Sequence, residues 1–272
     1  MTTLPLLGAA MSLDTLETLR DWLIADQRDL ELQDFSEAEV LCGDWTPLVA
    51  RAKALLQDYE GRLGIHGPFW GLSLANPDFE MRALVARRML QGLEVCEALG
   101  ASQMVIHSPY TTWDHNNLDN YPGARGRVVA LVRETLAEAV RRAEEIGVTL
   151  VIENIEDRDT DARCLLADSF DSPAVAVSVD TGHAHYAHDA TGAPPVDYFI
   201  RRAGERLRHV HLQDADGYAD RHWGIGQGTI NWPSVFDAVA PLEGRARLIL
   251  ELRDHGQILS SARWLAEQGL AR

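Results

Sequence analysis

Residues 207–232 read LRHVHLQDADGYADRHWGIGQGTINW. The apolar start of this stretch predicts a strand, and strand alternation places His209 and His211 on one of its faces. In the polar loop that follows, Asp220 and His222 are also two residues apart, so an extended loop aims both side chains the same way. Imidazole and carboxylate groups that converge at a strand end are what a divalent metal site requires.

The rest of the chain alternates in the same manner between short strand-like runs and longer helical stretches. Val148–Ile152 (VTLVI) is apolar on both faces, which is typical of strands buried in a parallel sheet. The helix predicted over Phe79–Leu99 repeats its apolar residues at helical spacing and ends at Gly100. The predicted strands are Leu6–Met11, Leu30–Phe35, Arg62–Phe69, Gln103–His107, Val148–Ile152, Val175–Val179, Leu207–Leu212 and Arg247–Leu252. The predicted helices are Leu13–Ile24, Pro47–Tyr59, Phe79–Leu99, Gly126–Ile146, Arg163–Phe170, Val196–Ala203, Trp232–Ala240 and Ile258–Gln268.

This order of elements predicts the fold class. Strand–helix units repeated through 272 residues predict an α/β protein, a single (β/α)8 TIM barrel over residues 1–272. A doubly wound open sheet is the alternative, but it needs fewer units, and no GxGxxG motif follows the first strand. The GIGQG of residues 224–228 follows the seventh strand and has the wrong spacing, so we interpret it as a turn.

Composition narrows the expected partners and compartment. A net charge of −16 disfavours nucleic acid, because an acidic surface repels phosphate backbones. The cysteines, Cys42, Cys96 and Cys164, form no CxxC pair and indicate buried free thiols in a reducing compartment. The N-terminus lacks the basic start of a secretory signal, and no apolar stretch is long enough to span a bilayer. We therefore expect a cytoplasmic protein that does not insert into membranes.

Acids and histidines gather at the predicted carboxyl ends of the strands, where TIM barrels carry their catalytic residues. Six consecutive strands, from the third to the eighth, end in such a residue. They contribute His66, His107, Glu153, Asp180 with His183, His211 and Glu251, and the loop after the seventh strand adds Asp220 and His222. Burying this many acids at one end of a barrel leaves uncompensated charge, which a divalent ion removes. The sequence therefore predicts a metal site at this end.

Each of these residues also has a simpler structural interpretation. His66 alone is typical of a hydrogen-bonded structural residue, and Asp180 alone is typical of a helix cap. Glu153 or Glu251 alone fits a paired carboxylate at a loop entrance. His209 lies one layer deeper than the ligand proposed on the same strand, and we interpret it as a core hydrogen-bonding residue. The remaining histidines are interpreted as loop or surface residues: His115, His185, His188 and His255.

Over nearly its whole length the sequence resembles the xylose-isomerase-like TIM barrels. This superfamily holds sugar and sugar-phosphate isomerases and epimerases, and also the endonuclease-IV type of abasic-site nucleases. In the epimerases one metal ion, often manganese, magnesium, cobalt or zinc, is held by Glu, Asp, His and Glu from strands five to eight. The resemblance places these ligands on Glu153, Asp180, His211 and Glu251.

The resemblance extends to the endonuclease-IV type, which holds three zinc ions with additional ligands. By motif these fall on His66, His107, His183 of DTGH, and Asp220 and His222 of DRH. The simplest epimerases lack the D-x-H pair, so its presence raises the expected number of ions from one to as many as three. The histidines favour zinc, whereas the carboxylates also admit manganese or magnesium.

The first functional hypothesis that the resemblance implies is a carbohydrate isomerase or epimerase. Glu153 and Glu251 face each other across the substrate, where one removes the proton next to a carbonyl and the other returns it, while the metal stabilises the enediolate. Trp70, Trp113 and Trp223 follow strands three, four and seven, where their rings can pack on a sugar; loop packing is the alternative for each. The resemblance does not specify which sugar is the substrate or whether it carries a phosphate. It is compatible with a homodimer, because barrels of this kind often pair.

The second hypothesis is zinc-dependent cleavage of abasic DNA, which the nine-residue match favours. The net charge of −16 opposes it, as does the lack of Lys and Arg in the loops Pro68–Pro77 and Pro109–Gly123. We therefore favour the small-molecule carbohydrate as substrate. A non-catalytic or hydrolytic relative is a third interpretation that fold alone allows, and the intact pair Glu153 and Glu251 argues against it.

Overall fold

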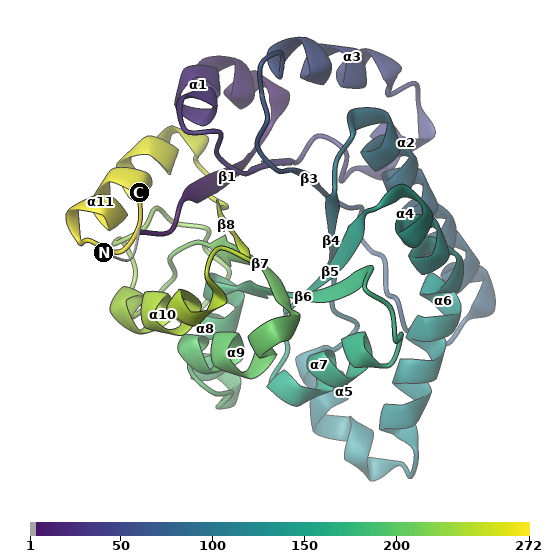
Figure 1. Ribbon diagram of the computed structural model, residues 1–272. Helices are drawn as coiled ribbons and strands as arrows, with labels where there is room; N and C mark the ends of the chain where they lie inside the picture. Colours follow the sequence, from purple (N-terminus) through teal and green to yellow (C-terminus); the bar gives the residue numbers. More distant parts are fainter. Residues whose placement is uncertain (1–3) are drawn as a thin grey trace.

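The computed structural model describes residues 4–272. Within these residues the strands pair in parallel and in chain order, and β1 pairs with β8, which closes the sheet into an eight-stranded barrel. Figure 1 shows the strands as a central ring that the helices enclose. The predicted (β/α)8 barrel is confirmed, and the open doubly wound sheet is wrong because a closed ring has no edge strand. Residues 1–3 of the predicted domain lie outside the described residues.

The elements follow one another as strand and helix along the chain. The strands are β1 Leu7–Met11, β2 Leu30–Leu32, β3 Leu63–His66, β4 Gln103–His107, β5 Thr149–Glu153, β6 Val175–Asp180, β7 Leu207–Leu212 and β8 Arg247–Leu250. The helices are α1 Leu13–Ala25, α2 Ala38–Cys42, α3 Thr46–Leu55, α4 Phe79–Leu99, α5 Thr112–Asn117, α6 Ala124–Ile146, α7 Thr160–Asp168, α8 Thr181–Thr191, α9 Val196–Ala203, α10 Trp232–Val239 and α11 Ile258–Glu267. Short 3₁₀ helices are η1 Leu118–Asn120, η2 Gly204–Arg206, η3 Ala240–Leu242 and η4 His255–Gln257.

Two separate apolar layers hold the barrel together. The larger lies between strands and helices and includes outward-facing strand residues such as Leu150 and Ile152. The smaller lies inside the barrel, where Val105, Val151 and Ala176 are in register on β4, β5 and β6. Because strand side chains alternate, the residues two positions further along β4 to β6 point into the same interior, one layer higher. That next layer is polar and forms the floor of the site described below.

Three helices were not predicted: α2, α5 and α8. Of these, α8 matters most, because it begins directly after β6. Asp180 caps it by accepting a hydrogen bond from the backbone N–H of His183 at 2.6 Å. The sequence of α8, TGHAHYAHDAT, is rich in histidine and alanine, so it lacks the apolar stripe that reveals a helix. The helix-cap interpretation of Asp180 is confirmed.

Several predicted bounds shift by a few residues. The second strand was expected to run to Phe35 but ends at Leu32, because the chain turns at the barrel rim, where the Ser36 N–H donates to the Gln33 carbonyl. The third strand ends at His66 rather than Phe69, and it is followed by Gly67 and Pro68. Proline has no N–H with which to extend the ladder.

Two further expectations are tested by the structure. All cysteines are free thiols, as predicted, but Cys42 is exposed, because it ends the short surface helix α2 and does not reach the core. Among residues 4–272, no helix combines the length and the apolar character that crossing a membrane requires.

Candidate metal centre

Four acidic and histidine side chains meet at the carboxyl ends of adjacent strands, and we call them the quartet. They are Glu153 on β5, Asp180 on β6, His211 on β7 and Glu251 directly after β8. Strand register places Asp180 beside His211. One donor atom of each residue lies within 4.8 Å of the donor atoms of the others. All four are buried, so the structure brings the predicted quartet together with little exposure to solvent.

His211 contacts carboxylates through both of its ring nitrogens. Its Nδ1 lies 2.7 Å from Glu153 Oε1 and 3.2 Å from Glu251 Oε2. Its Nε2 lies 3.0 Å from Oε1 of Glu31, a buried acid on β2. Glu31 was not among the predicted site residues. Both ring nitrogens of His211 therefore face carboxylates, one set inside the quartet and one beneath it.

Two further groups of donors flank the quartet. In the first, Nε2 of His66 and Nε2 of His107 lie 3.8 and 3.6 Å from Glu153 Oε2. In the second, which we call the loop triad, Asp220 Oδ1 lies 3.4 Å from His183 Nε2 and 3.0 Å from His222 Nε2. All nine residues expected to bind metal thus lie in three neighbouring groups, and Glu153 belongs to two of them.

Gln213 connects the loop triad to the quartet. Its buried amide Nε2 donates to Asp180 Oδ1 at 3.2 Å and to Asp220 Oδ1 at 3.1 Å, and its Oε1 accepts from the backbone N–H of His222 at 2.7 Å. A Cβ at Gly182 would lie 2.2 Å from the Gln213 side chain, so glycine leaves the room that this amide occupies. The loop is not extended as expected, because His222 has φ 50°. Gln213, rather than strand-like alternation, aims the two loop residues at one point.

Asp214 anchors the rest of this loop. Its carboxylate accepts hydrogen bonds from the N–H of Gly226 at 2.8 Å and from Trp232 Nε1 at 3.1 Å. Its backbone forms an antiparallel bridge with Trp223. Gly226 has φ 87°, a conformation that L side chains rarely adopt. The interpretation of GIGQG as a turn is confirmed.

Burial and neighbouring charges act against each other on the two central groups. Burial raises the pKa of Glu153, but the charge and hydrogen bond of His211 outweigh it and hold that pKa well below its usual range. Burial lowers the pKa of His211, but the carboxylates of Glu251, Glu31 and Glu153 outweigh it and hold the pKa well above the usual value. In the metal-free protein the two groups therefore form a buried ion pair.

The other groups differ in protonation. Burial raises the pKa of Asp180 to about 6, against the opposing charge of His183. Burial lowers the pKa of His107 to about 3, so this imidazole is neutral and has a free lone pair. For His222, burial is outweighed by Glu251 and Asp220, which raise its pKa to about 9. A metal ion at the loop triad must therefore displace a proton.

A cavity of about 600 Å³ opens above these groups. Asp180 and His211 lie beneath its floor and do not line it. Its walls are formed by Gln33, Ser36, Glu37, His66, Phe69, Trp70, Gly71, His107, Glu153, Ile155, His183, Asp220, His222, Glu251, Leu252, Arg253 and His255. Gln33, Ser36 and Glu37, from the loop after β2, were missed because polar loop residues carry no local signal of what they face.

The structure places some of the predicted tryptophans and remaining histidines at the cavity and others away from it. Trp70 lines the cavity, whereas Trp113 on α5 is 76% exposed and Trp223 packs under the guanidinium of Arg221. Neither Trp113 nor Trp223 lines the cavity. His209 is a core residue, as expected, with its Nδ1 2.8 Å from Ser178 Oγ. The loop or surface interpretation of the other histidines is incomplete for one of them, because His255 lines the cavity.

The chain matches, over residues 16–268, the family of xylose isomerase-like TIM barrels. It belongs to this family. The match covers nearly all of the chain, and the resemblance seen in the sequence is thereby confirmed.

Three individual proteins show how similar known proteins are to this chain. Protein MJ1311 of Methanocaldococcus jannaschii is 24% identical over 245 residues, which span 85% of this chain and 79% of that protein. Fructoselysine 3-epimerase of Escherichia coli O157:H7 is 32% identical over 101 residues, 35% of each chain. The TTHB071 protein from Thermus thermophilus, in a structure soaked with ZnCl2, is 27% identical with a TM-score of 0.72, and 97% of both chains are covered.

The donor set of the quartet and its flanking groups fits a divalent cation. Two buried carboxylate oxygens, Glu153 Oε2 and Asp180 Oδ2, have no hydrogen-bond partner within residues 4–272, which is costly unless an ion satisfies them. Three N···O separations in the flanking groups, of 3.4, 3.6 and 3.8 Å, are longer than a usual hydrogen bond, and the fourth, between His222 and Asp220, is 3.0 Å. They are close to the separation of about 3 to 3.5 Å between two ligands that each lie about 2.1 Å from one ion.

Proposed function

We propose that this protein is a divalent-metal-dependent carbohydrate isomerase or epimerase that removes a proton from the carbon next to a sugar carbonyl and then returns one. One observation carries the proposal. Glu153 and Glu251 both line the cavity, and both lie within 3.2 Å of the same nitrogen of His211. Two carboxylates that flank one cation-binding centre at the floor of a cavity are suited to accept a proton and to return one.

In the proposed reaction the chain's own residues handle the proton. Glu153 lines the cavity and lies 3.6 Å from Nε2 of His107, and we assign it the removal of the substrate proton. Glu251 is held in place by Gln33, whose Nε2 donates to Glu251 Oε1 at 3.0 Å, and we assign it the return of the proton. A divalent cation held by Glu153, Asp180, His211 and Glu251 would supply stabilisation of the enediolate's negative charge.

The cavity walls fit a small hydroxylated molecule. Gln33, Ser36 and Glu37 offer hydrogen-bonding groups on one side, and Trp70 offers a ring that can pack on sugar C–H groups. Fructoselysine 3-epimerase, which matches this chain over a third of its length, acts on a sugar derivative by its name, and this agrees with the proposal.

A second candidate, zinc-dependent cleavage of a phosphodiester, is favoured by the two flanking donor groups. Phosphodiester cleavage by this chemistry uses ions that activate water and neutralise the leaving oxygen, and three groups of donors provide places for several ions. The lining residues oppose it, because Arg253 is the one Arg or Lys side chain among them. A nucleic acid backbone needs more cations than that.

Elemental analysis of protein purified without added metal tests the proposal first. About one equivalent of manganese, magnesium, cobalt or zinc supports the quartet, and ketoses are then screened for incorporation of deuterium from solvent. Two or three equivalents of zinc require a direct assay on abasic DNA. A protein that contains no metal, takes up none, and exchanges no substrate proton would overturn the proposal.

A further inference from the structure

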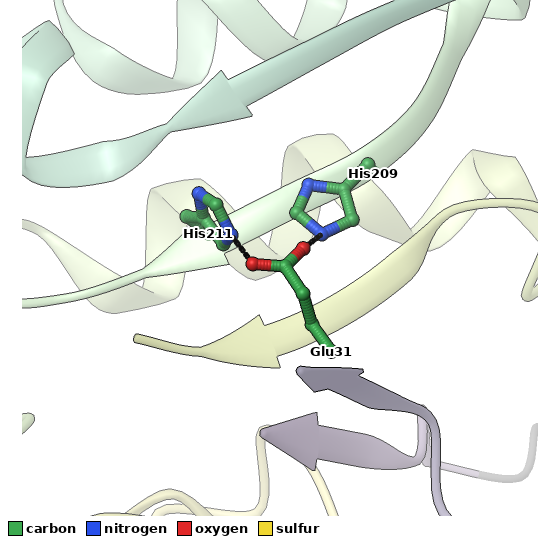
Figure 2. Close-up of side chains that lie close together, drawn as sticks. All are labelled: Glu31, His209 and His211. Carbon is green, nitrogen blue, oxygen red and sulfur yellow. Dashed lines mark hydrogen bonds and ion pairs between the residues drawn. The ribbon is translucent and has the colours of Figure 1, made fainter. Parts of the chain in front are cut away.

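Glu31 occupies an unusual place in the barrel. It lies on β2 but meets side chains of β7, and these two strands are not neighbours in the ring. Figure 2 shows its carboxylate between the imidazoles of His209 and His211. Oε1 lies 3.0 Å from His211 Nε2, and Oε2 lies 3.1 Å from His209 Nε2. Glu31 is 3% exposed and does not line the cavity, so it cannot touch a substrate there.

The two nitrogens of His211 point toward different partners. Nδ1 faces Glu153 and Glu251 in the quartet, and Nε2 faces Glu31 below it. A carboxylate is an acceptor only, and carboxylates face both nitrogens, so the metal-free imidazole is held with a proton on each. A cation bound among the quartet carboxylates would displace the proton from Nδ1, whereas the carboxylate of Glu31 would keep the proton on Nε2. The lone pair is then left on Nδ1, which is the nitrogen that faces the quartet.

We propose that Glu31 is a positioning residue that fixes the tautomer and orientation of His211, so that Nδ1 is presented to a divalent cation. This inference rests on the proposed function, because it requires that the quartet binds metal. His209 steadies the arrangement from the other side, since its Nδ1 is anchored 2.8 Å from Ser178 Oγ while its Nε2 faces Glu31. Carboxylates that hold the second nitrogen of a histidine ligand raise its basicity and orient its ring.

The same three side chains are close enough to be considered as a metal site of their own. Two features favour the positioning role. None of the three residues lines the cavity, whereas Glu153 and Glu251 of the quartet do, so an ion has access from the cavity to the quartet but not to this group. An ion at this point would also have to take Nε2 of His211 away from the carboxylate that holds its proton.

The test measures Zn²⁺ affinity by competition with a chelator for the wild type, Glu31→Leu, Glu31→Gln and a control. Glu31→Leu removes the acceptor, and we expect Zn²⁺ to bind about 10- to 100-fold more weakly. Glu31→Gln keeps the volume and one acceptor oxygen but replaces a charged acceptor with a weaker neutral one, so we expect a smaller loss of about fivefold. Asp29→Asn is the matched control, because Asp29 is a buried acid that directly precedes β2 and pairs with Arg62 rather than with a histidine. It should leave Zn²⁺ affinity unchanged.

A second readout reports the tautomer directly. In long-range ¹H–¹⁵N spectra of the Zn²⁺-loaded wild type, we expect the His211 proton on Nε2, shifted downfield by its carboxylate partner. In Glu31→Gln this resonance should move upfield. A role limited to stability would lower the melting temperature and leave the resonance where it is.

The outcomes separate this inference from the proposed function. Unchanged affinity and an unchanged His211 resonance in Glu31→Gln overturn the inference alone, provided that Asp180→Asn weakens Zn²⁺ binding. Loss of a whole equivalent of Zn²⁺ from Glu31→Leu, with unchanged affinity for the rest, also overturns it, because Glu31 would then be a ligand. Wild-type protein that binds no Zn²⁺ overturns both.

Discussion

Acidic side chains are buried at both ends of this barrel, but different partners neutralise them. At the amino end, Asp29 receives two hydrogen bonds from Arg62, and the buried Arg247 donates to Ser102 Oγ at 2.8 Å. At the carboxyl end, within residues 4–272, every ion pair of the quartet and loop-triad acids is with a histidine. Arginine stays charged at any ordinary pH, whereas histidine can release its proton and bind a metal.

The nature of the partner separates the buried acids that are structural from those that are suited to bind a metal ion. In the pair of Asp29 with Arg62, the carboxylate already accepts two hydrogen bonds from a guanidinium that stays charged, so its charge is compensated without a metal ion. The histidine-compensated end has exchangeable charge, and it also contains the unpartnered oxygens of Glu153 and Asp180. This difference predicts that changes at the carboxyl end alter metal content and activity, whereas changes at the amino end alter stability alone.

The largest effect is expected from Glu153→Gln. This change removes a carboxylate shared by the quartet and the His66–His107 group, so metal content should fall and proton exchange should drop by about 10²- to 10⁴-fold. Elemental analysis and deuterium incorporation measure the two effects. At the other end, Asp29→Asn should lower the free energy of unfolding by about 1–3 kcal/mol, measured in urea, while metal content stays the same. Full activity in Glu153→Gln contradicts the assignment.

A smaller effect is expected from loosening the loop triad. Gln213→Leu removes the amide that holds Asp220 and His222 against the quartet, so the ion at the triad should be lost before the ion at the quartet. Inductively coupled plasma mass spectrometry gives the metal-to-protein ratio. His222→Ala should lower the ratio by the same amount. A ratio that neither variant changes argues for one ion, held by the quartet.

The smallest effect is a pH dependence of stability in the metal-free protein. The pKa of His222 is raised to about 9 in the folded state, mainly by Glu251 after burial is overcome, and it is about 6.5 when unfolded. The folded state therefore binds more protons between these values, so the stabilisation is complete below about pH 6.5 and is lost as pH rises through about 9. Urea unfolding in the presence of a chelator should show this decline.

His222→Gln is the control for the pH prediction, and it should make the decline shallower, because the pKa values of His183 and His211 are also raised and these residues still contribute. The arginines of the amino end do not titrate in this interval, so they contribute no slope. Zn²⁺ affinity should change in the opposite direction and increase with pH, because the proton on His222 competes with the ion. Stability that rises from about pH 6.5 to about 9 without metal would show that the histidine charge does not stabilise this end.

Prediction from sequence succeeded where a signal repeats or where position along a strand decides the outcome. The barrel was predictable because apolar runs such as Val148–Ile152 alternate with amphipathic helices such as Phe79–Leu99. The convergence of Glu153 and Asp180 was predictable because parallel strands in a barrel end at one rim. The roles of these residues as ligands and catalysts stay predictions that the experiments above address.

Glu31 and α8 show why the remainder was not predictable. The tripeptide LEL of β2 has the same pattern as a strand with one solvent-facing acid, and only barrel closure places Glu31 opposite His209 and His211. The helix α8 has too few apolar residues to show a stripe, and its start depends on the Asp180 cap. Trp70 and Trp113 are alike as loop residues in sequence, but the structure alone separates them.

The order of the elements, the closed barrel and the rim at which acids and histidines gather could be predicted from the chain, since they follow from local periodicity and from strand direction. The tertiary structure decided which nitrogen of His211 faces the quartet, that Gln213 joins the loop to it, and that histidines compensate its acids. These features depend on contacts between residues far apart in the chain. No local pattern encodes such contacts, because they exist only when the barrel closes.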